Sequence, residues 1–259
     1  MKYLLLPPSE GKREGGTGSW LPNTGMFGAL GAARSEVSDA VRMFARRASR
    51  AELEKFFGVG GQHLERAVAA AQTGFISEPV LPAAERYSGV VWEHLGIATL
   101  RAADRRWCVQ HVVVVSGLLG LVAGVDPVPD YRLKMSARLP TLGVLSQWWR
   151  PRLLDAARSA FARAEVVDAL PNEHASAFAP EAVARRVVRL RFMSATGANA
   201  AGHAAKAAKG LAARAIVEQR SAVTETVCSA MQLPGFRYSE VEHVSKRPVV
   251  REVRMRAAQ

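Results

Sequence analysis

Short runs of consecutive apolar residues recur along the chain and predict the buried strands of a sheet. Tyr3–Leu6 and the β-branched run Val112–Val115 are the strongest of them. A strand that is covered on both faces has no polar face to alternate with, so its sequence is continuously apolar. The other predicted strands are 165–168 and 187–193, followed by the alternating closing pair 236–242 and 248–253.

Between these runs, apolar residues recur with the three- and four-residue spacing of helices. The pattern predicts helices over 36–50, 51–57, 62–72, 87–95, 148–163 and 198–219. No repeat and no change of composition divides the chain. We therefore expect a mixed α/β fold, a single domain over 1–259 with a central β-sheet, surrounding helices and an inserted helical subregion at 36–75. Ser9–Asn23 is rich in glycine, serine and proline, and long irregular loops of this kind are often functional.

Three glycines separate two of the predicted helices, although glycine inside a helix costs about 1 kcal/mol relative to alanine. At the first and third turn positions, Gly58 and Gly60 permit left-handed φ angles and leave the backbone without a Cβ. The next helix begins with unpaired N–H groups at the positive end of its dipole, which favours a bound anion. The pattern resembles the helix-hairpin-helix of DNA-binding proteins, which predicts phosphate contacts at Gly58, Val59, Gly60 and Gly61. The alternative is an ordinary interhelical turn with a glycine cap.

The charge of the chain narrows the choice of partner. Lysine and arginine number 35 against 23 acidic residues, a net charge of +12 with an isoelectric point near 10.5. This excess favours nucleic acid, an anionic membrane surface or a phosphorylated ligand. A charge that serves only solubility is the alternative. The basic residues near the glycines that we expect to neutralise phosphates are Arg46, Arg47, Arg50, Lys55 and Arg66.

Other patterns exclude several classes of protein. The apolar stretch Val112–Val125 is too short to span a membrane, and the first residues have no secretory apolar region. Cys108 and Cys228 form no CxxC pair, and the six histidines show no metal spacing, so we expect neither a metal nor a cofactor. These features predict a protein of the reducing cytoplasm, with Cys108 as a buried thiol.

A second group of residues offers acid and base chemistry. Pro7–Lys12 (PPSEGK) follows the first strand, but it lacks the spacing of a Walker phosphate loop. Asp130–Lys134 follows the buried run at 112, and loops after buried strands are where α/β proteins place ligands. The candidate catalytic residues that we expect to share a pocket are Ser9, Glu10, Lys12, Tyr131, Arg132, Glu173 and Lys206.

Neighbouring charges can tune the carboxylates, lysines and tyrosine of this group toward general acid/base work. Lys12 or Lys206 would stabilise an oxyanion or act as a nucleophile. The alternative is that these residues form a buried salt-bridge network that only organises the core.

The order of these motifs over nearly the whole chain resembles the YaaA peroxide stress protein family. Pro7–Lys12 matches the first family motif in full. The Ser-Gly-x-x-Gly-Leu, Asp-Pro and Tyr-Arg-Leu run and the lysine-rich helix are matched by Ser116, Gly117, Gly120, Leu121, Asp126, Pro127, Tyr131, Arg132, Leu133, Lys206, Lys209 and Gly210. The chain departs from the family at 168–174, where only Glu173 is kept, and at Lys134 and Lys209.

The resemblance implies a mixed α/β fold that carries a helix-hairpin-helix. It also implies a cytoplasmic protein that binds duplex and single-stranded DNA with little sequence preference and limits oxidative damage under peroxide stress.

Two functions therefore stay open. The first is sequence-nonspecific binding of DNA phosphates in the peroxide stress response. The second is an enzyme, a lyase or hydrolase that uses general acid/base chemistry without a metal on a nucleobase, a nucleotide or a small anionic metabolite. A glycosylase-like reaction, with Glu10 or Glu173 as the acid, would unite both functions because such enzymes flip a base into a pocket.

Overall fold

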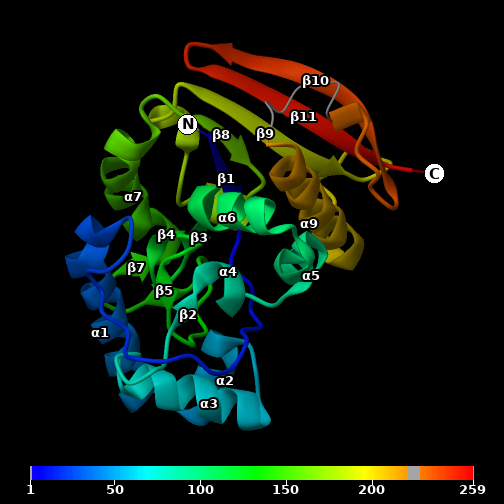
Figure 1. Cartoon of the computed structure of the whole chain (residues 1–259). Coiled ribbons are helices and arrows are strands. Elements are labelled where there is room, and N and C mark those ends of the chain that lie inside the picture. Colours follow the sequence, from blue (N-terminus) through cyan, green and yellow to red (C-terminus); the bar gives the residue numbers. More distant parts are fainter. Residues whose placement is uncertain (1, 221–227, 259) are drawn as a thin grey trace.

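A seven-stranded sheet in the order β10-β11-β9-β8-β1-β3-β4 forms the centre of the molecule (Figure 1). The computed structural model describes residues 2–220 and 228–258. The five strands from β11 to β3 are parallel, whereas β10 and β4 run antiparallel at the two edges. The strands are β1 Lys2–Leu6, β3 Val112–Ser116, β4 Gly120–Ala123, β8 Glu165–Asp168, β9 Arg186–Met193, β10 Phe236–Lys246 and β11 Val249–Ala257.

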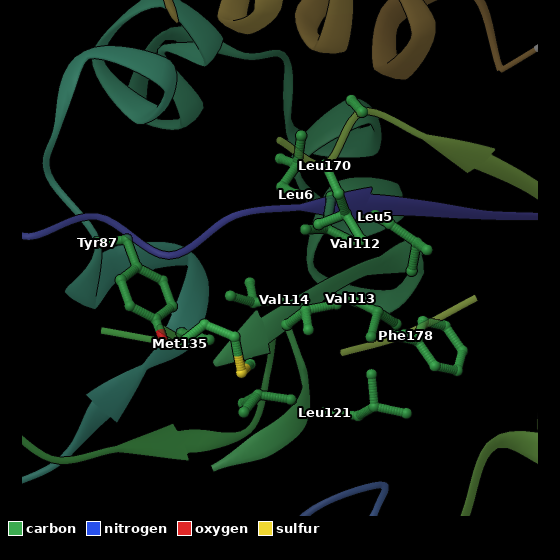
Figure 2. Close-up of a cluster of buried hydrophobic side chains, with 14 of the residues drawn as sticks. Leu5, Leu6, Tyr87, Val112, Val113, Val114, Leu121, Met135, Leu170 and Phe178 are labelled. Atoms are coloured by element: carbon green, nitrogen blue, oxygen red, sulfur yellow. The ribbon is translucent and has the colours of Figure 1, made fainter. Parts of the chain in front are cut away.

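The middle strands of this sheet are the most deeply buried part of the chain. Leu4–Leu6 of β1 and Val112–Val115 of β3 are fully buried, as their continuous apolar runs predict. Figure 2 shows side chains of β1 and β3 in one apolar cluster with Leu121 of β4 and Phe178. The loops that leave the carboxyl ends of β1 and β3 therefore start from a rigid base.

Helices α1 to α3 form a unit at the end of the molecule opposite the β10–β11 hairpin (Figure 1). The α-helices are α1 Gly31–Arg47, α2 Arg50–Phe57, α3 Gly61–Gln72, α4 Ala83–Arg86, α5 Val90–Leu95, α6 Ala102–His111, α7 Leu145–Phe161, α8 Asn172–Ala175 and α9 Gly202–Gln219. The 3-10 helices are Gly28–Leu30, Ile97–Thr99 and Pro180–Ala182, and the short paired strands are β2 Leu81–Pro82 with β5 Pro127–Val128, and β6 Arg138–Leu139 with β7 Gly143–Val144. Within residues 2–220 and 228–258, no helix combines the length and the apolar content needed to cross a membrane.

The predicted fold class, a mixed α/β domain around a central sheet, is confirmed, and each predicted strand is present. The helix predicted over 36–50 spans Gly31–Arg47, and helix α6 was not predicted. Two further stretches differ in conformation. The helix expected from 87 begins only at Val90, because the backbone of Tyr87 pairs with that of Lys12. After Ser116 the chain does not enter a loop directly, since it turns with Gly120 at a φ of 67° and returns as β4.

The irregular loop after β1 is held in place by two buried arginines. Arg34 of α1 donates to the carbonyls of Pro22 and Thr24 at 2.8 and 2.9 Å, and also to Leu119 and Leu121. The guanidinium of Arg86 donates to four carbonyls, those of Arg13, Gly15, Pro79 and Val128. A loop without regular hydrogen bonding thus has its carbonyls satisfied by side chains.

Candidate functional site

The turn between α2 and α3 has the two-helix geometry that its glycines predict. A capping box between Ser49 and Glu52 starts α2, and Gly58 ends it with a left-handed φ of 65°. The expectation of a left-handed φ at Gly60 is wrong: its φ of −124° is extended, and Gly61 takes the left-handed value of 54° instead. Any residue can adopt the backbone of Gly60. Glycine is strictly needed only at Gly58 and Gly61, where φ is left-handed.

The glycines of this turn are exposed, and of their amides that of Gly58 donates to the carbonyl of Glu54 at 2.8 Å. Gly58, Gly60 and Gly61 are all exposed, and no side chain caps the first turn of α3. A Cβ built on Gly60 or Gly61 would meet no atom within 4 Å. The apolar residues Leu53 and Phe57 of α2 and Leu64 and Ala67 of α3 are buried, and the two helices are in contact. The start of α3 therefore offers N–H groups and a positive dipole end to solvent.

The structure spreads the five predicted basic residues over different surfaces. Arg46 donates to the carbonyl of Gln72 at 3.0 Å, at the far end of α3 and about 17 Å along the helix from the turn. Arg50 pairs with Glu54 at 3.3 Å, and Arg47 lines a cavity on the outer side of α1 with Met43.

Arg66 lies on α3 after the turn, but its charge is already matched by acids. It donates to Asp130 at 2.6 Å and also to Glu14. Lys55, in the last turn of α2, lines a cavity of about 340 Å³ together with Lys134 and Arg138. The nitrogen of Lys134 would lie 2.9 Å from a Cβ on Gly58. Lys134, which also lies 4.0 Å from Glu10, is therefore the cation beside the turn, and Lys55 and Arg138 share its cavity. The sequence indicated only Lys55.

A cavity of about 480 Å³ lies between the loop after β1 and helix α3. Glu10, Lys12, Tyr131 and Arg132 line it from one set of loops, and Val59, His63 and Arg66 line it from the turn and α3. Arg132 links the end of α2 to the loop after β1, because it donates to the carbonyl of Phe57 at 2.8 Å and to Glu10 at 2.7 Å. The PPSEGK loop and the glycine turn, which are distant in sequence, therefore line one hollow.

Lys12 is the central amine of this cavity. Its nitrogen donates to the carbonyl of Ser9 at 2.9 Å and lies 4.0 Å from the ring centre of Tyr131. Burial lowers the pKa of Lys12 to about 7; Arg132 and Arg86 add to this effect, and Asp130 and Glu10 oppose it. At neutral pH about half of the Lys12 amines are therefore unprotonated.

Behind Lys12 lies a buried chain of three hydroxyl groups. The Tyr131 hydroxyl is 2.9 Å from that of Tyr87 and 2.7 Å from Ser116 Oγ, which also accepts from the amides of Leu118 and Leu119. Burial raises the pKa of Tyr131 to about 12 and that of Tyr87 still further from its usual value. Both tyrosines therefore stay protonated and hold the wall of the cavity.

Ser9, Glu173 and His174 lie on a smaller cavity of about 70 Å³ that shares Glu10, Lys12, Tyr131 and Arg132 with the larger one. Ser9 Oγ donates to Gly11 and accepts from the amide of Ser88 at 3.0 Å, so its hydroxyl fixes the loop. Burial opposes ionisation of Glu173, but two hydrogen bonds of 2.9 Å from Ser136 leave its pKa below the usual value.

His174 is a buried base beside this smaller cavity. Burial lowers the pKa of His174 to about 4, with Glu173 opposing the shift and Lys209 adding to it. Its Nδ1 atom makes no hydrogen bond among the described residues. The imidazole is therefore neutral at pH 7.

Lys206 does not join the other candidates. It is exposed on α9 and lines a separate cavity of about 290 Å³ with Arg191 and Lys209. Burial lowers the pKa of Lys209 to about 8, although the negative charge of Asp168 opposes this shift. Six of the seven candidates thus line one cavity, and Lys206 does not. Local sequence patterns did not indicate the buried partners Tyr87 and His174, because burial is not visible in such patterns.

The fold and the site define a class of α/β protein. In this class, a helix pair with an exposed glycine turn lies over a cavity that contains a lysine. The chain belongs to the peroxide stress protein YaaA family, whose model matches residues 1–242. It is 33% identical over 220 residues to a UPF0246 protein of Streptomyces coelicolor, and this alignment covers 83% of this chain and 82% of the relative. A UPF0246 protein of Ruegeria pomeroyi is 29% identical over 224 residues, covering 82% and 87% of the two chains.

Proposed function

We propose that this protein binds DNA in the peroxide stress response by holding backbone phosphates at the turn Gly58–Gly61, without reading sequence. The observation that carries the proposal is the exposed, uncapped start of α3, where a Cβ on Gly60 or Gly61 would meet nothing within 4 Å. Amides at such a helix start bind phosphate oxygens, and the helix dipole strengthens the attraction.

The charges around the turn support the same function. The net charge of +12 attracts a polyanion, and Lys55, Lys134 and Arg138 line a cavity beside the turn. Contacts to phosphates carry no sequence information, so affinity would be similar for different sequences and would depend steeply on salt. Arg46 and Arg50 add only to the long-range field, because their side chains are held away from the turn.

A Gly60→Asp substitution tests this proposal with little risk to the fold. The backbone of Gly60 is extended and its Cβ position is open, so aspartate fits and can cap α3. The new carboxylate occupies the free amides and repels phosphate. We expect DNA affinity to fall at least about tenfold, which corresponds to about 1.4 kcal/mol, as measured by fluorescence anisotropy with a duplex oligonucleotide over a salt series.

Two further variants show whether a loss of DNA affinity comes from blocking the amides of α3 or from the added negative charge. Gly60→Asn caps the helix without adding charge, and we expect it to weaken binding less than Gly60→Asp. Ala204→Asp adds the same negative charge at an exposed position of α9 and is expected to change affinity little. If Gly60→Asp binds DNA as tightly as the wild type, the turn is only an element of the fold.

A second candidate function, an enzyme acting on a nucleobase, nucleotide or small anionic metabolite, is favoured by one observation. Glu10, Lys12, Tyr131 and Arg132 line one cavity, which phosphate-backbone binding at the turn does not require. The paired carboxylate and the partly neutral amine supply acid and base groups at the same place.

The two candidates respond differently to a Glu10→Gln substitution. We expect this variant to keep its DNA affinity within about twofold, because Glu10 lies outside the turn and the change removes only one exposed carboxylate. If the cavity is catalytic, the same variant loses its protection of cells against peroxide. Full protection by Glu10→Gln would instead leave DNA binding as the sole function.

A further inference from the structure

Among the described residues, the amine of Lys12 forms no ion pair with a carboxylate, so it is free to act as a nucleophile. The two carboxylates nearest to it are paired with other residues, Glu10 with Arg132 at 2.7 Å and Asp130 with Arg66 at 2.6 Å. The nitrogen of Lys12 keeps one hydrogen bond, to the carbonyl of Ser9, and rests on the face of Tyr131. An amine with this environment is available to a ligand in the cavity.

The amine is also in the protonation state that reacts. Burial lowers the pKa of Lys12 to about 7, so about half of the amines carry a free electron pair at neutral pH. An exposed lysine with its usual pKa is unprotonated in fewer than about one molecule in a thousand at that pH. Neutral lysines in dry sites attack carbonyl carbons and form Schiff bases.

The cavity has the size and the walls for a phosphorylated sugar. Its volume of about 480 Å³ lies in the usual range of small-molecule sites. Val59 of the glycine turn and His63 of the first turn of α3 line the same cavity as Lys12. A ligand whose phosphate binds at the helix start would enter the cavity beside these two residues and extend its carbon chain toward the amine.

We infer that Lys12 forms an imine with the aldehyde of a ring-opened deoxypentose 5-phosphate whose phosphate is held at the start of α3. This inference rests on the proposed binding of phosphate at the glycine turn. The same chemistry is present in two sources: an abasic site within a DNA strand, and free 2-deoxyribose 5-phosphate.

The reaction needs no co-reactant. The Lys12 nitrogen attacks the C1 carbonyl carbon, the C–N bond forms, and the carbonyl oxygen takes up a proton. The resulting carbinolamine then loses its hydroxyl group and the remaining nitrogen-bound proton as one water molecule, leaving the C=N bond. No atom is oxidised or reduced in this step.

Borohydride trapping tests the inference, because hydride converts the imine into a stable secondary amine. The full-length protein would be incubated with a duplex oligonucleotide that carries one abasic site, and separately with 2-deoxyribose 5-phosphate. A tetrahydrofuran abasic analogue, which has no aldehyde, is the matched probe. We expect an adduct with at least one of the two aldehydes and none with the analogue, located on Lys12 by peptide mass spectrometry.

Lys12→Arg keeps a cationic side chain and removes the nucleophile. We expect its adduct yield to fall at least about tenfold, since exposed lysines are almost wholly protonated and Lys209, whose pKa burial lowers to about 8, lies in the separate cavity. Lys206→Arg, in the separate cavity, is expected to trap as well as the wild type. The wild-type yield should rise with pH up to about 8 and then level off, whereas surface lysines would continue to gain above pH 9. An adduct on other lysines, or an undiminished yield from Lys12→Arg, overturns the inference.

The outcomes also separate this inference from the proposed function. DNA binding without an adduct from either aldehyde overturns the imine and leaves DNA binding standing. An adduct with free 2-deoxyribose 5-phosphate in a protein that does not bind DNA supports the imine and overturns DNA binding. Loss of the oligonucleotide adduct in Gly60→Asp, with intact trapping by the wild type, supports the placement of the phosphate at the turn.

Discussion

Arg86→Met is expected to lower the free energy of unfolding by about 3–5 kcal/mol, because each of four carbonyls left without its donor costs about 1 kcal/mol. The Arg86 side chain is almost fully buried, and its guanidinium donates to four carbonyls from three segments of the chain. Methionine fills much of the volume but donates to none of these carbonyls. Each of them then loses a charge-assisted hydrogen bond.

Chemical denaturation monitored by circular dichroism measures this effect. Arg158→Met is the matched control, because Arg158 is exposed and its only described ion pair, with Asp155 at 3.4 Å, is at the surface. We expect the control to change stability by no more than about 0.5 kcal/mol. A loss below 1 kcal/mol for Arg86→Met would mean that solvent satisfies the loop carbonyls as well as the guanidinium does.

Gly210→Ala is expected to destabilise the protein by about 2 kcal/mol or more, although alanine is the better helix former by about 1 kcal/mol. Gly210 lies within α9, where a Cβ would come within 2.4 Å of the Val91 carbonyl oxygen and 2.7 Å of His94 Cβ in α5. The two helices must separate to admit the methyl group, and the buried contacts between them are lost.

Ala207→Gly in the middle of the same helix provides the comparison. It lies on a partly exposed face, so we expect only the loss of helix propensity, about 1 kcal/mol. Both substitutions would then destabilise α9 although they change the sequence in opposite directions. Thermal unfolding of the pair measures this, and a stabilised Gly210→Ala would show that α5 moves away from α9 at little cost.

The sequence predicted the parts of the site that follow from strand ends. Continuous apolar runs identified β1 and β3 as buried strands, and PPSEGK and Tyr131–Arg132 follow them in the chain. Strand order could not be predicted, and it decides which loops meet. Because β8 neighbours β1, Glu173 reaches the cavity, whereas β9 lies one strand further out and the segment after it leads to Lys206 in a different cavity.

The glycine turn shows a second limit of the sequence. The pattern predicted two helices joined at Gly58–Gly61, and the two helices are in contact, with Leu53, Phe57, Leu64 and Ala67 buried. It assigned the left-handed conformation to Gly60 rather than Gly61, because spacing alone does not show which residue becomes the cap. Nor did it show that Arg66 is matched by Asp130 and Glu14, since those contacts join distant segments.

Arg34 and Arg86 hold the loop after β1 through its main chain, which affects how the sequence of this loop can vary within the family. Their partners in that loop are main-chain oxygens at Arg13, Gly15, Pro22 and Thr24, which every amino acid supplies. Exposed side chains of the loop, such as those of Arg13 and Thr17, are thus free to drift in evolution, as long as both guanidinium groups, the buried Trp20 and the tightly packed Gly16 and Gly25 are retained. New ligand preferences at the rim of the cavity can therefore arise there without a new scaffold.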